Sequence, residues 1–305
     1  MSTTEVKTSN SPGCLIQLLW FVFIGIAYAI VFALLRTGYI AGDSFYMYTL
    51  LIMVPVLLLF NLVTYFFSDK MVLAAYNAQI VDERSAPRLA KVVRRVAERF
   101  NLPMPRLAIV PSETPNAFAT GRDPEHAVVA VTAGNMDMLT DDELEGVIGH
   151  EMAHVKDRDI LLMSIVATAA AIISIAARII LYQMIFGRRD TRVNPLVLLA
   201  AAITAPIAAM LVQLAISRTR EYKADMVGAK TTMKPLALAR ALSKLESVNT
   251  RNPMQMQHQN PAHASLFIVN PFRGGGFVSL FSTHPPIKER IRRLQAMASR
   301  EGYLQ

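Results

Sequence analysis

"GVIGHEMAHVKDRDILLMSIVATAAAIISIAA", residues 146–177, joins two patterns that decide the fold. The first part places His150 and His154 four residues apart. On a helix these two side chains share one face, so both imidazoles can reach a single metal ion. The second part, Ile160–Ala177, carries no charge and is long enough to enter a lipid bilayer. The sequence therefore predicts a metal site directly beside a hydrophobic helix.

The composition favours a membrane protein over a soluble domain. Of the 305 residues, 53% are hydrophobic, and the formal net charge is +8. No compact lysine and arginine block with interleaved aromatic residues occurs, so no nucleic-acid partner is expected. The positive charge is typical of the cytoplasmic flanks of membrane helices. Because Cys14 is the only cysteine, histidine and carboxylate side chains must hold any metal ion.

Four hydrophobic segments divide the chain. Cys14–Leu35 has 22 residues without a charge, enough for a helix to cross a hydrocarbon layer of roughly 30 Å. Phe45–Phe67 is the second segment, with aromatic residues at both ends and Pro55 inside it. Ile160–Ala177 and Pro195–Ile216 are the third and fourth segments. Their lengths favour membrane helices, and the alternative is a helical hairpin buried in a soluble core.

The positively charged residues predict how these segments are oriented. Residues 68–159 contain eleven lysines and arginines and residues 217–305 contain fourteen, so both parts are expected in the cytoplasm. The arginine-rich turn Gly187–Arg192 leaves open whether the second pair of segments crosses the membrane completely. We therefore expect a multi-pass membrane protein, built from a cytoplasmic N-terminus (1–13), two transmembrane helices (14–67), one cytoplasmic part (68–159), a hydrophobic hairpin (160–216) and a second cytoplasmic part (217–305).

The parts outside these segments are predicted to form an α+β domain that is mostly α-helical. Thr140 and Glu143 have the spacing of a capping box and predict where the helix with both histidines begins. Strands are predicted at Arg106–Val110 and His126–Thr132, with a loop or edge strand between them. The other predicted helices are Ser85–Phe100, about Ser217–Lys230, Lys234–Val248 and Pro286–Ser299.

Glu151 completes the H-E-x-x-H pattern of zinc proteases. It lies between the histidines, close enough to take a proton from metal-bound water. The alternative is a helix with two surface histidines and a chance glutamate. Two histidines do not complete a catalytic zinc site, which usually takes three protein ligands. No third histidine follows soon after His154, where the chain offers Asp157 and Asp159 instead.

The segment Ser217–Ala229, SRTREYKADMVGA, supplies the missing ligand. Glu221 and Asp225 lie four residues apart and share one helical face. Glu221 could bind the metal, while Asp225 accepts a hydrogen bond from a ligand imidazole and fixes its orientation. The alternative for Glu221 is an exposed ion pair with Arg218 or Arg220.

Together with Pro115–Gly121 (PNAFATG) and Ser282–Leu294 (STHPPIKERIRRL), these motifs resemble the HtpX family of bacterial membrane zinc metalloproteases, which is related to the CAAX prenyl endopeptidases. The resemblance covers nearly the whole chain. It implies a multi-pass protein of the inner membrane. Residues 68–159 and 217–305 would form the two halves of a thermolysin-like (gluzincin) protease domain at the cytoplasmic face, with one zinc ion per chain. It also implies that the substrates are misfolded or unassembled membrane proteins. The family's metal ligands correspond to His150, His154 and Glu221, and its catalytic glutamate corresponds to Glu151.

Two further parts of the chain are expected to assist catalysis. His284 is a candidate hydrogen-bond donor to the oxyanion of the reaction, and the alternative is a loop histidine without a role. The backbone around Asn116 is a candidate partner for an extended substrate, bound by strand addition. The long loop Arg251–Gly276 has no predicted role.

Two other functions stay open. A prenyl-protein endopeptidase would carry the same motif, but the small number of hydrophobic segments is unlike the larger helical chamber of those enzymes. A catalytically inactive scaffold or zinc-binding regulator is the second, and the intact Glu151 speaks against it. Proteolysis by the wild type but not by Glu151→Gln would separate an enzyme from a scaffold. The oligomeric state is not predicted.

Overall fold

The computed structural model describes residues 45–186, 195–251 and 285–302. The chain divides after Asn77 into two units, which we describe separately. Several predicted features lie outside the described residues: the segment Cys14–Leu35, the turn Gly187–Arg192, all but the first residue of the loop Arg251–Gly276, and His284.

The first unit contains α2 (Phe45–Phe66) and α3 (Ser68–Ala75). The helix predicted at Phe45–Phe67 is confirmed, and Pro55 lies within it. Among the described residues, no single helix has the length and hydropathy of a membrane span. The pair Pro55–Phe66 and Ser68–Ala75, bent by 70°, reaches them only together.

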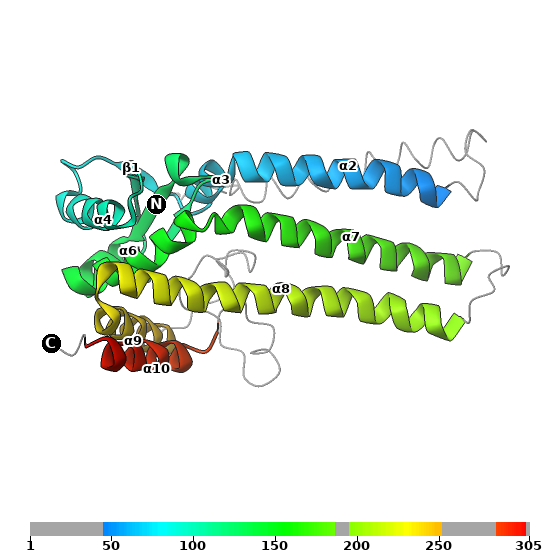
Figure 1. The fold of residues 1–305 in the computed structure, drawn as a ribbon. Helices are drawn as coiled ribbons and strands as arrows, with labels where there is room; N and C mark the ends of the chain where they lie inside the picture. Colours follow the sequence, from blue (N-terminus) through cyan, green and yellow to red (C-terminus); the bar gives the residue numbers. More distant parts are fainter. Residues whose placement is uncertain (1–44, 187–194, 252–284, 303–305) are drawn as a thin grey trace, which may run out of the picture. The chain divides into compact units, whose positions relative to one another are not determined.

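The second unit contains a four-stranded mixed sheet (Figure 1). The predicted strand Arg106–Val110 is confirmed, and the strand predicted at His126–Thr132 begins two residues later, after a 3-10 turn over Pro124–His126. The segment left open as loop or edge strand forms an edge strand. A short strand at Gln79–Val81 is not predicted, because it has only three residues and two are exposed. The strands are β1 (Gln79–Val81), β2 (Arg106–Val110), β3 (Ala117–Thr120) and β4 (Val128–Thr132), in the order β1-β2-β4-β3.

The sheet has one parallel pair at its centre. β2 and β4 run parallel with Leu107 beside Val129, while β1 and β3 add antiparallel strands at the two edges. All five residues of β4 are buried, as expected for a central strand. β3 pairs with β4 on one side only within the part of the chain that the structure describes.

The helix that carries both histidines is α6 (Asp141–Lys156). The predicted capping box is present: the Glu143 backbone N–H donates to Thr140 Oγ1, and the Thr140 N–H donates to the Glu143 carboxylate at 2.9 Å. Three acidic residues in its first turn complement the positive end of the helix dipole. Every residue from Glu143 to Ala153 is buried, so α6 is a central helix of the domain.

Two further helices precede α6 in the sequence. α4 (Pro87–Phe100) confirms the helix predicted at Ser85–Phe100, starting at a proline suited to the first helical turn and ending at the left-handed Asn101 (φ 53°). α5 (Ala133–Met138) is not predicted. It is a six-residue helix capped by Thr132, too short to show helical periodicity in the sequence.

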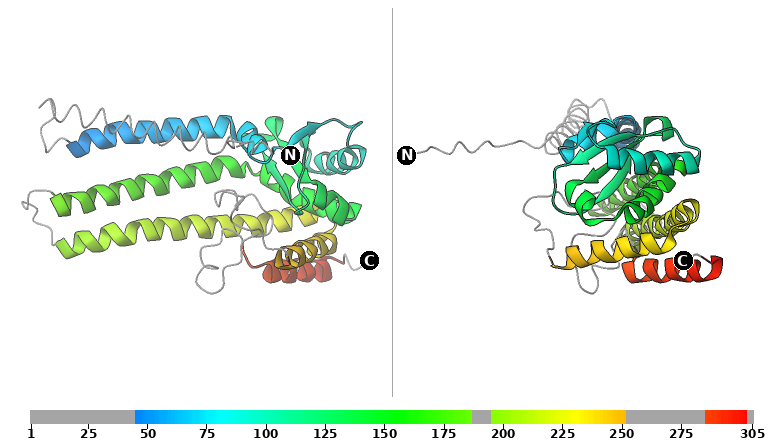
Figure 2. Two further views of the ribbon diagram at one scale, coloured as in Figure 1. Left: turned by 180° about the vertical axis from the view of Figure 1, so that it is seen from behind. Right: turned by 90° about the vertical axis from the view of Figure 1, so that its left-hand side faces the viewer.

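The two hydrophobic segments after α6 form α7 (Asp159–Phe186) and α8 (Pro195–Thr232), which lie side by side (Figures 1 and 2). The prediction that a separate helix begins near Ser217 is wrong. The change from apolar to charged residues contains no proline or glycine at that point, so the helix continues without a break. The hydrophobic half of α8 and the half that carries Glu221 are therefore one rigid element.

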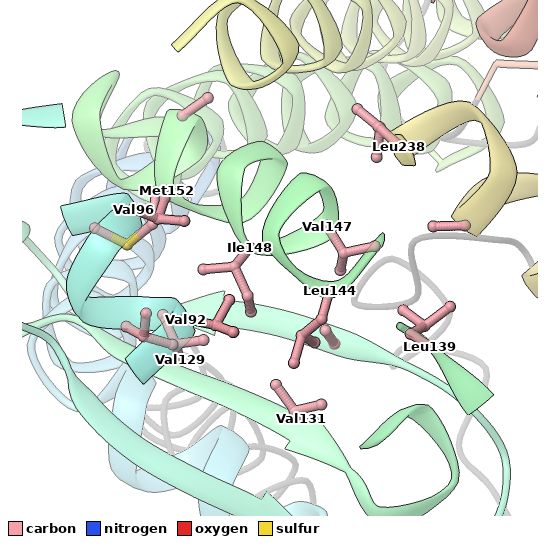
Figure 3. Close-up of a cluster of buried hydrophobic side chains, with 14 of the residues drawn as sticks. Val92, Val96, Val129, Val131, Leu139, Leu144, Val147, Ile148, Met152 and Leu238 are labelled. Carbon is pink, nitrogen blue, oxygen red and sulfur yellow. The ribbon is translucent and has the colours of Figure 1, made fainter. Parts of the chain in front are cut away.

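The core forms around α6 (Figure 3). Leu144 and Ile148 point toward Val129 and Val131 of β4, and Leu238 approaches the helix from another side. Burial stabilises each such side chain by roughly 1.5–3 kcal/mol, and this holds the motif helix in place. The two C-terminal helices, close to their predicted positions, are α9 (Pro235–Arg251) and α10 (Ile287–Glu301).

Candidate active site

The buried helix α6 presents His150, Glu151 and His154 from its C-terminal half. His150 and Glu151 are buried, while His154 is half-buried. The Nε2 atoms of the two histidines lie 3.2 Å apart, as the i, i+4 spacing predicts. The alternative of two unrelated surface histidines is therefore wrong.

Helix α8 brings Glu221 to the same point. Its Oε2 atom lies 3.7 Å from His150 Nε2, and its Oε1 atom lies 3.5 Å from His154 Nε2. This approach depends on glycines, because a Cβ atom on Gly228 would lie 2.7 Å from the backbone carbonyl carbon of Gly149 and 2.7 Å from the nitrogen of His150. The two helix backbones thus touch where the ligands meet.

The three side chains fit a tetrahedral metal ion. Bonds of about 2.0–2.1 Å to such an ion would place neighbouring ligand atoms about 3.3–3.4 Å apart, close to the separations seen here. His150 Nδ1 lies 2.9 Å from Asp225, and His154 Nδ1 lies 2.6 Å from Asp159. If each Nδ1 donates its proton to a carboxylate, both Nε2 atoms keep a lone pair. Two imidazole lone pairs and a carboxylate then converge, a donor set that suits zinc.

Asp225 occupies the place that the sequence suggests, within hydrogen-bond distance of His150. A residue that the prediction missed holds it there. The side chain of Arg290 donates from Nε and Nη2 to the two oxygens of Asp225, both at 2.7 Å, and its Nη1 lies 3.4 Å from Glu221. Arg290 comes from α10 and is completely buried. Burial by itself would raise the pKa of Asp225, but the charge of Arg290 holds it below its usual value.

The sequence contains a signal for Arg290. The buried face of α10 consists of Ile287, Arg290, Leu294 and Ala298, which are spaced as one helical stripe. A charged residue within an otherwise apolar stripe needs a buried partner, and the partner here is Asp225.

The contact of His154 with Asp159 is also not predicted from the sequence. Asp159, whose oxygen accepts from His154 Nδ1, is buried at the start of α7 and is also paired with Arg220. Arg220, one of the two arginines considered as an ion-pair partner of Glu221, thus pairs with Asp159. Asp157, the other carboxylate after the motif, pairs with Lys223 at 2.7 Å.

Glu151 faces the edge strand β3. The backbone N–H of Ala119 donates to its Oε2 atom at 2.8 Å, so this amide is directed away from β4. Burial raises the pKa of Glu151, against the opposing effect of both histidines. A raised pKa suits a carboxylate that must accept a proton near neutral pH. Asn116, which precedes β3, is buried and paired with Thr132.

The chain is similar in sequence and in fold to known proteins. A protease HtpX homolog of Thermococcus kodakarensis is 53% identical over 247 residues, which cover 80% of this chain and 84% of the relative. A protease HtpX homolog of Pyrococcus furiosus is 48% identical over 274 residues, covering 89% and 93%. The crystal structure of Ste24p from S. mikatae is similar in fold, with a TM-score of 0.57 at 20% identity, over 95% of this chain and 66% of that one.

The expected resemblance to HtpX is thus confirmed. The family model of peptidase family M48 matches residues 83–298, which include α4, the strands β2, β3 and β4, α6 and most of α10. With its H-E-x-x-H helix and this match over more than half of its length, the chain belongs to peptidase family M48 and is a metalloprotease.

Proposed function

We propose that this metalloprotease is a zinc-dependent endopeptidase of the inner membrane that cleaves misfolded or unassembled membrane proteins at the cytoplasmic face. One observation carries the proposal. The ligand atoms of His150, His154 and Glu221 converge within 3.2–3.7 Å, beside Glu151 and at the base of two long apolar helices. A metal-dependent hydrolytic centre is thereby joined to a segment suited to lipid.

The residues have separate roles in this proposal. His150, His154 and Glu221 hold one zinc ion per chain, and Asp225 orients His150. Zinc at this position would lower the pKa of a water molecule toward ~7 and polarise the peptide carbonyl. Glu151 takes the proton of the attacking water and later delivers it to the leaving amine. The amide of Ala119 holds the Glu151 carboxylate in the orientation for this transfer.

The substrate binds in extended form along β3. In the described residues this strand stands at the end of the sheet order. Its Ala119 amide donates to Glu151, so the open edge of the strand lies on the side of the catalytic glutamate. An extended peptide that adds to such an edge gains backbone hydrogen bonds without regard to most of its side chains. Broad recognition of this kind suits an enzyme for misfolded proteins.

His284 donates to the oxyanion in this proposal. It precedes Arg290 by six residues in the sequence, and Arg290 lies inside the site. A donor besides zinc stabilises the developing charge, and its loss typically costs ~10²–10³ in turnover.

The membrane location rests on the apolar surface of α8. Seven of its large apolar side chains, from Leu196 to Val212, are 36–72% exposed, which is unusual for a surface in water. Lipid around α7 and α8 would cover this surface. The positively charged residues on both sides of the pair favour the cytoplasm for the catalytic parts.

The proposal is tested in cells that produce either the wild type or Glu151→Gln. Fragments of an unassembled membrane protein should appear with the wild type and not with the variant, while both purified proteins contain zinc. Equal fragment patterns would indicate a zinc-binding scaffold. Cleavage confined to a prenylated CAAX peptide would instead indicate a prenyl-protein endopeptidase.

A further inference from the structure

The metal ligand His154 is held less firmly by packing than His150 is. Its side chain is 20% exposed, against 2% for His150, and it lies in the last turn of α6. A ligand near a helix end needs a hydrogen-bond partner to fix its ring. That partner is Asp159, whose Oδ2 atom lies 2.6 Å from His154 Nδ1.

Asp159 is itself fixed on two sides. It is the first residue of α7, directly after Arg158, whose left-handed conformation (φ 53°) turns the chain out of α6. Its other oxygen, Oδ1, pairs with Arg220 of α8, and the Arg220 side chain is only 15% exposed. A buried carboxylate with an imidazole at one oxygen and a guanidinium at the other has little freedom to turn.

Arg220 precedes the ligand Glu221 in the sequence. Helix α8 therefore reaches the ligand cluster by two routes, directly through Glu221 and indirectly through Arg220, Asp159 and His154. The other histidine has an equivalent chain of contacts, in which Arg290 pairs with Asp225 and Asp225 pairs with His150.

We infer that Asp159 and Arg220 are positioning residues of the metal centre. Arg220 holds the Asp159 carboxylate, and this carboxylate keeps the proton of His154 on Nδ1, so that Nε2 is directed to the metal with its lone pair. The inference rests on the proposed zinc function. The inference adds that the contacts of Asp159 with His154 and Arg220, where α6, α7 and α8 meet, set the affinity for zinc.

A neighbouring ion pair provides a matched control. Asp157 and Lys223 lie 2.7 Å apart and join the end of α6 to the C-terminal half of α8, two and three residues from Asp159 and Arg220 in the sequence. Neither belongs to the cluster of possible metal ligands in the described residues. Loss of this pair removes one contact between α6 and α8 and leaves His154 and its partner in place.

The test compares zinc affinity in the full-length, detergent-solubilised variants Asp159→Asn, Arg220→Gln, Asp157→Asn and Lys223→Gln, measured by competition with a chelator. Asp159→Asn should weaken zinc binding by roughly 10–100-fold, because the amide can donate to Nδ1 and favour the wrong tautomer. Arg220→Gln should also weaken zinc binding. The two control variants should bind zinc as the wild type does.

A double variant shows whether the two residues act as one unit. If Arg220 acts through Asp159, the double variant Asp159→Asn/Arg220→Gln should lose little more affinity than Asp159→Asn alone. Arg220→Lys keeps the charge and should lie between the wild type and Arg220→Gln. Thermal unfolding of each metal-free variant separates weak binding from loss of the fold, and affinity is then measured on the folded fraction.

The outcomes separate this inference from the proposed function. Wild-type zinc affinity in folded Asp159→Asn and Arg220→Gln would overturn the inference and leave the zinc protease intact. An equal loss in all four single variants would also overturn it, because these contacts would then act only through general stability. If the wild type binds no zinc, both the proposed function and the inference fail.

Discussion

Glu151 is the residue on which the proposed chemistry depends most directly. Glutamine at this position keeps the shape of the side chain but cannot accept a proton. We expect Glu151→Gln to retain zinc and the fold and to lose turnover by roughly 10²–10⁴-fold or more. Zinc content and peptide cleavage measured on the same purified sample check this. Substantial cleavage by the variant would assign the role of base to another residue.

Glu221 and Asp225 lie one helical turn apart, yet they should respond differently to alanine. Glu221→Ala removes a ligand and should abolish activity and most zinc binding. Asp225→Ala removes only the partner of His150 and should weaken zinc binding by roughly 10–100-fold. Metal titration of both variants measures the difference. Full zinc binding by Glu221→Ala would place the third ligand elsewhere, whereas equal losses would mean that Asp225 contacts the metal itself.

At the residue scale, spacing predicted which side chains the structure brings close together. The positions of His150 and His154 follow from one helix, and Glu221 was found because Asp225 shares its face. Asp159 is named in the sequence only as a carboxylate after the motif, and Arg290 is not predicted at all. Their roles depend on which helices meet at the site, and no local period records that α10 packs against α8 there.

At the element scale, the close contact between α6 and α8 sets the distance between the ligands. Gly228→Ala would place a methyl group 2.7 Å from the backbone of Gly149 and His150, so α8 must move outward. Glu221 moves with it, and we expect weaker zinc binding and a destabilisation of about 1–3 kcal/mol. Zinc titration and thermal unfolding measure both effects. Met226→Ala, at an exposed position of the same helix, should change neither.

The start of α6 provides a stability prediction with a defined pH dependence. Glu143 closes the capping box and pairs with Lys244 at 2.6 Å. Burial alone would raise the pKa of Glu143, but Lys244 and Thr140 hold it below its ordinary value of 4.5. A depressed folded-state pKa stabilises the protein above the unfolded-state value, and this contribution is lost as the pH falls through the folded-state pKa.

Glu143→Gln keeps the shape of the capping side chain and removes the charge. The variant should therefore be less stable than the wild type at neutral pH, and the difference should shrink as the pH falls below about 4.5. Denaturant unfolding at a series of pH values tests this. A difference that is constant from neutral to acid pH would show that the charge of Glu143 contributes nothing.

The bounds of some helices and strands follow from the sequence more closely than those of others. Helices with a clear cap or a proline at the start, such as α4 and α6, lie within about two residues of their predicted bounds. The break expected at Ser217 is absent, because a change from apolar to charged residues alters the surroundings of a helix without interrupting its hydrogen bonds. β1 was missed because three residues, mostly exposed, carry no usable alternation.

At the scale of the whole molecule, the order of the chain raises a question of topology. The ligands His150 and Glu221 lie on opposite sides of the α7–α8 pair in the sequence, and the structure brings their side chains within 3.7 Å. A single zinc ion would need a ligand atom of each residue within about 2 Å of the metal. If α7 and α8 lie in lipid, as we propose, residues 68–159 and 217–305 must then face the same compartment.

Reporter fusions test this topology directly. The 25 lysines and arginines in these two parts predict the cytoplasm, so fusions at Lys70, Lys156 and Lys230 should all report a cytoplasmic location. A fusion at Gly42, between the first two hydrophobic segments, should report the outside. A fusion within Gly187–Arg192 distinguishes a complete crossing from a hairpin that enters the membrane and returns, and either result keeps the site intact. A cytoplasmic signal at Lys156 with an external signal at Lys230 would refute the topology, because Glu221 could then never meet His150.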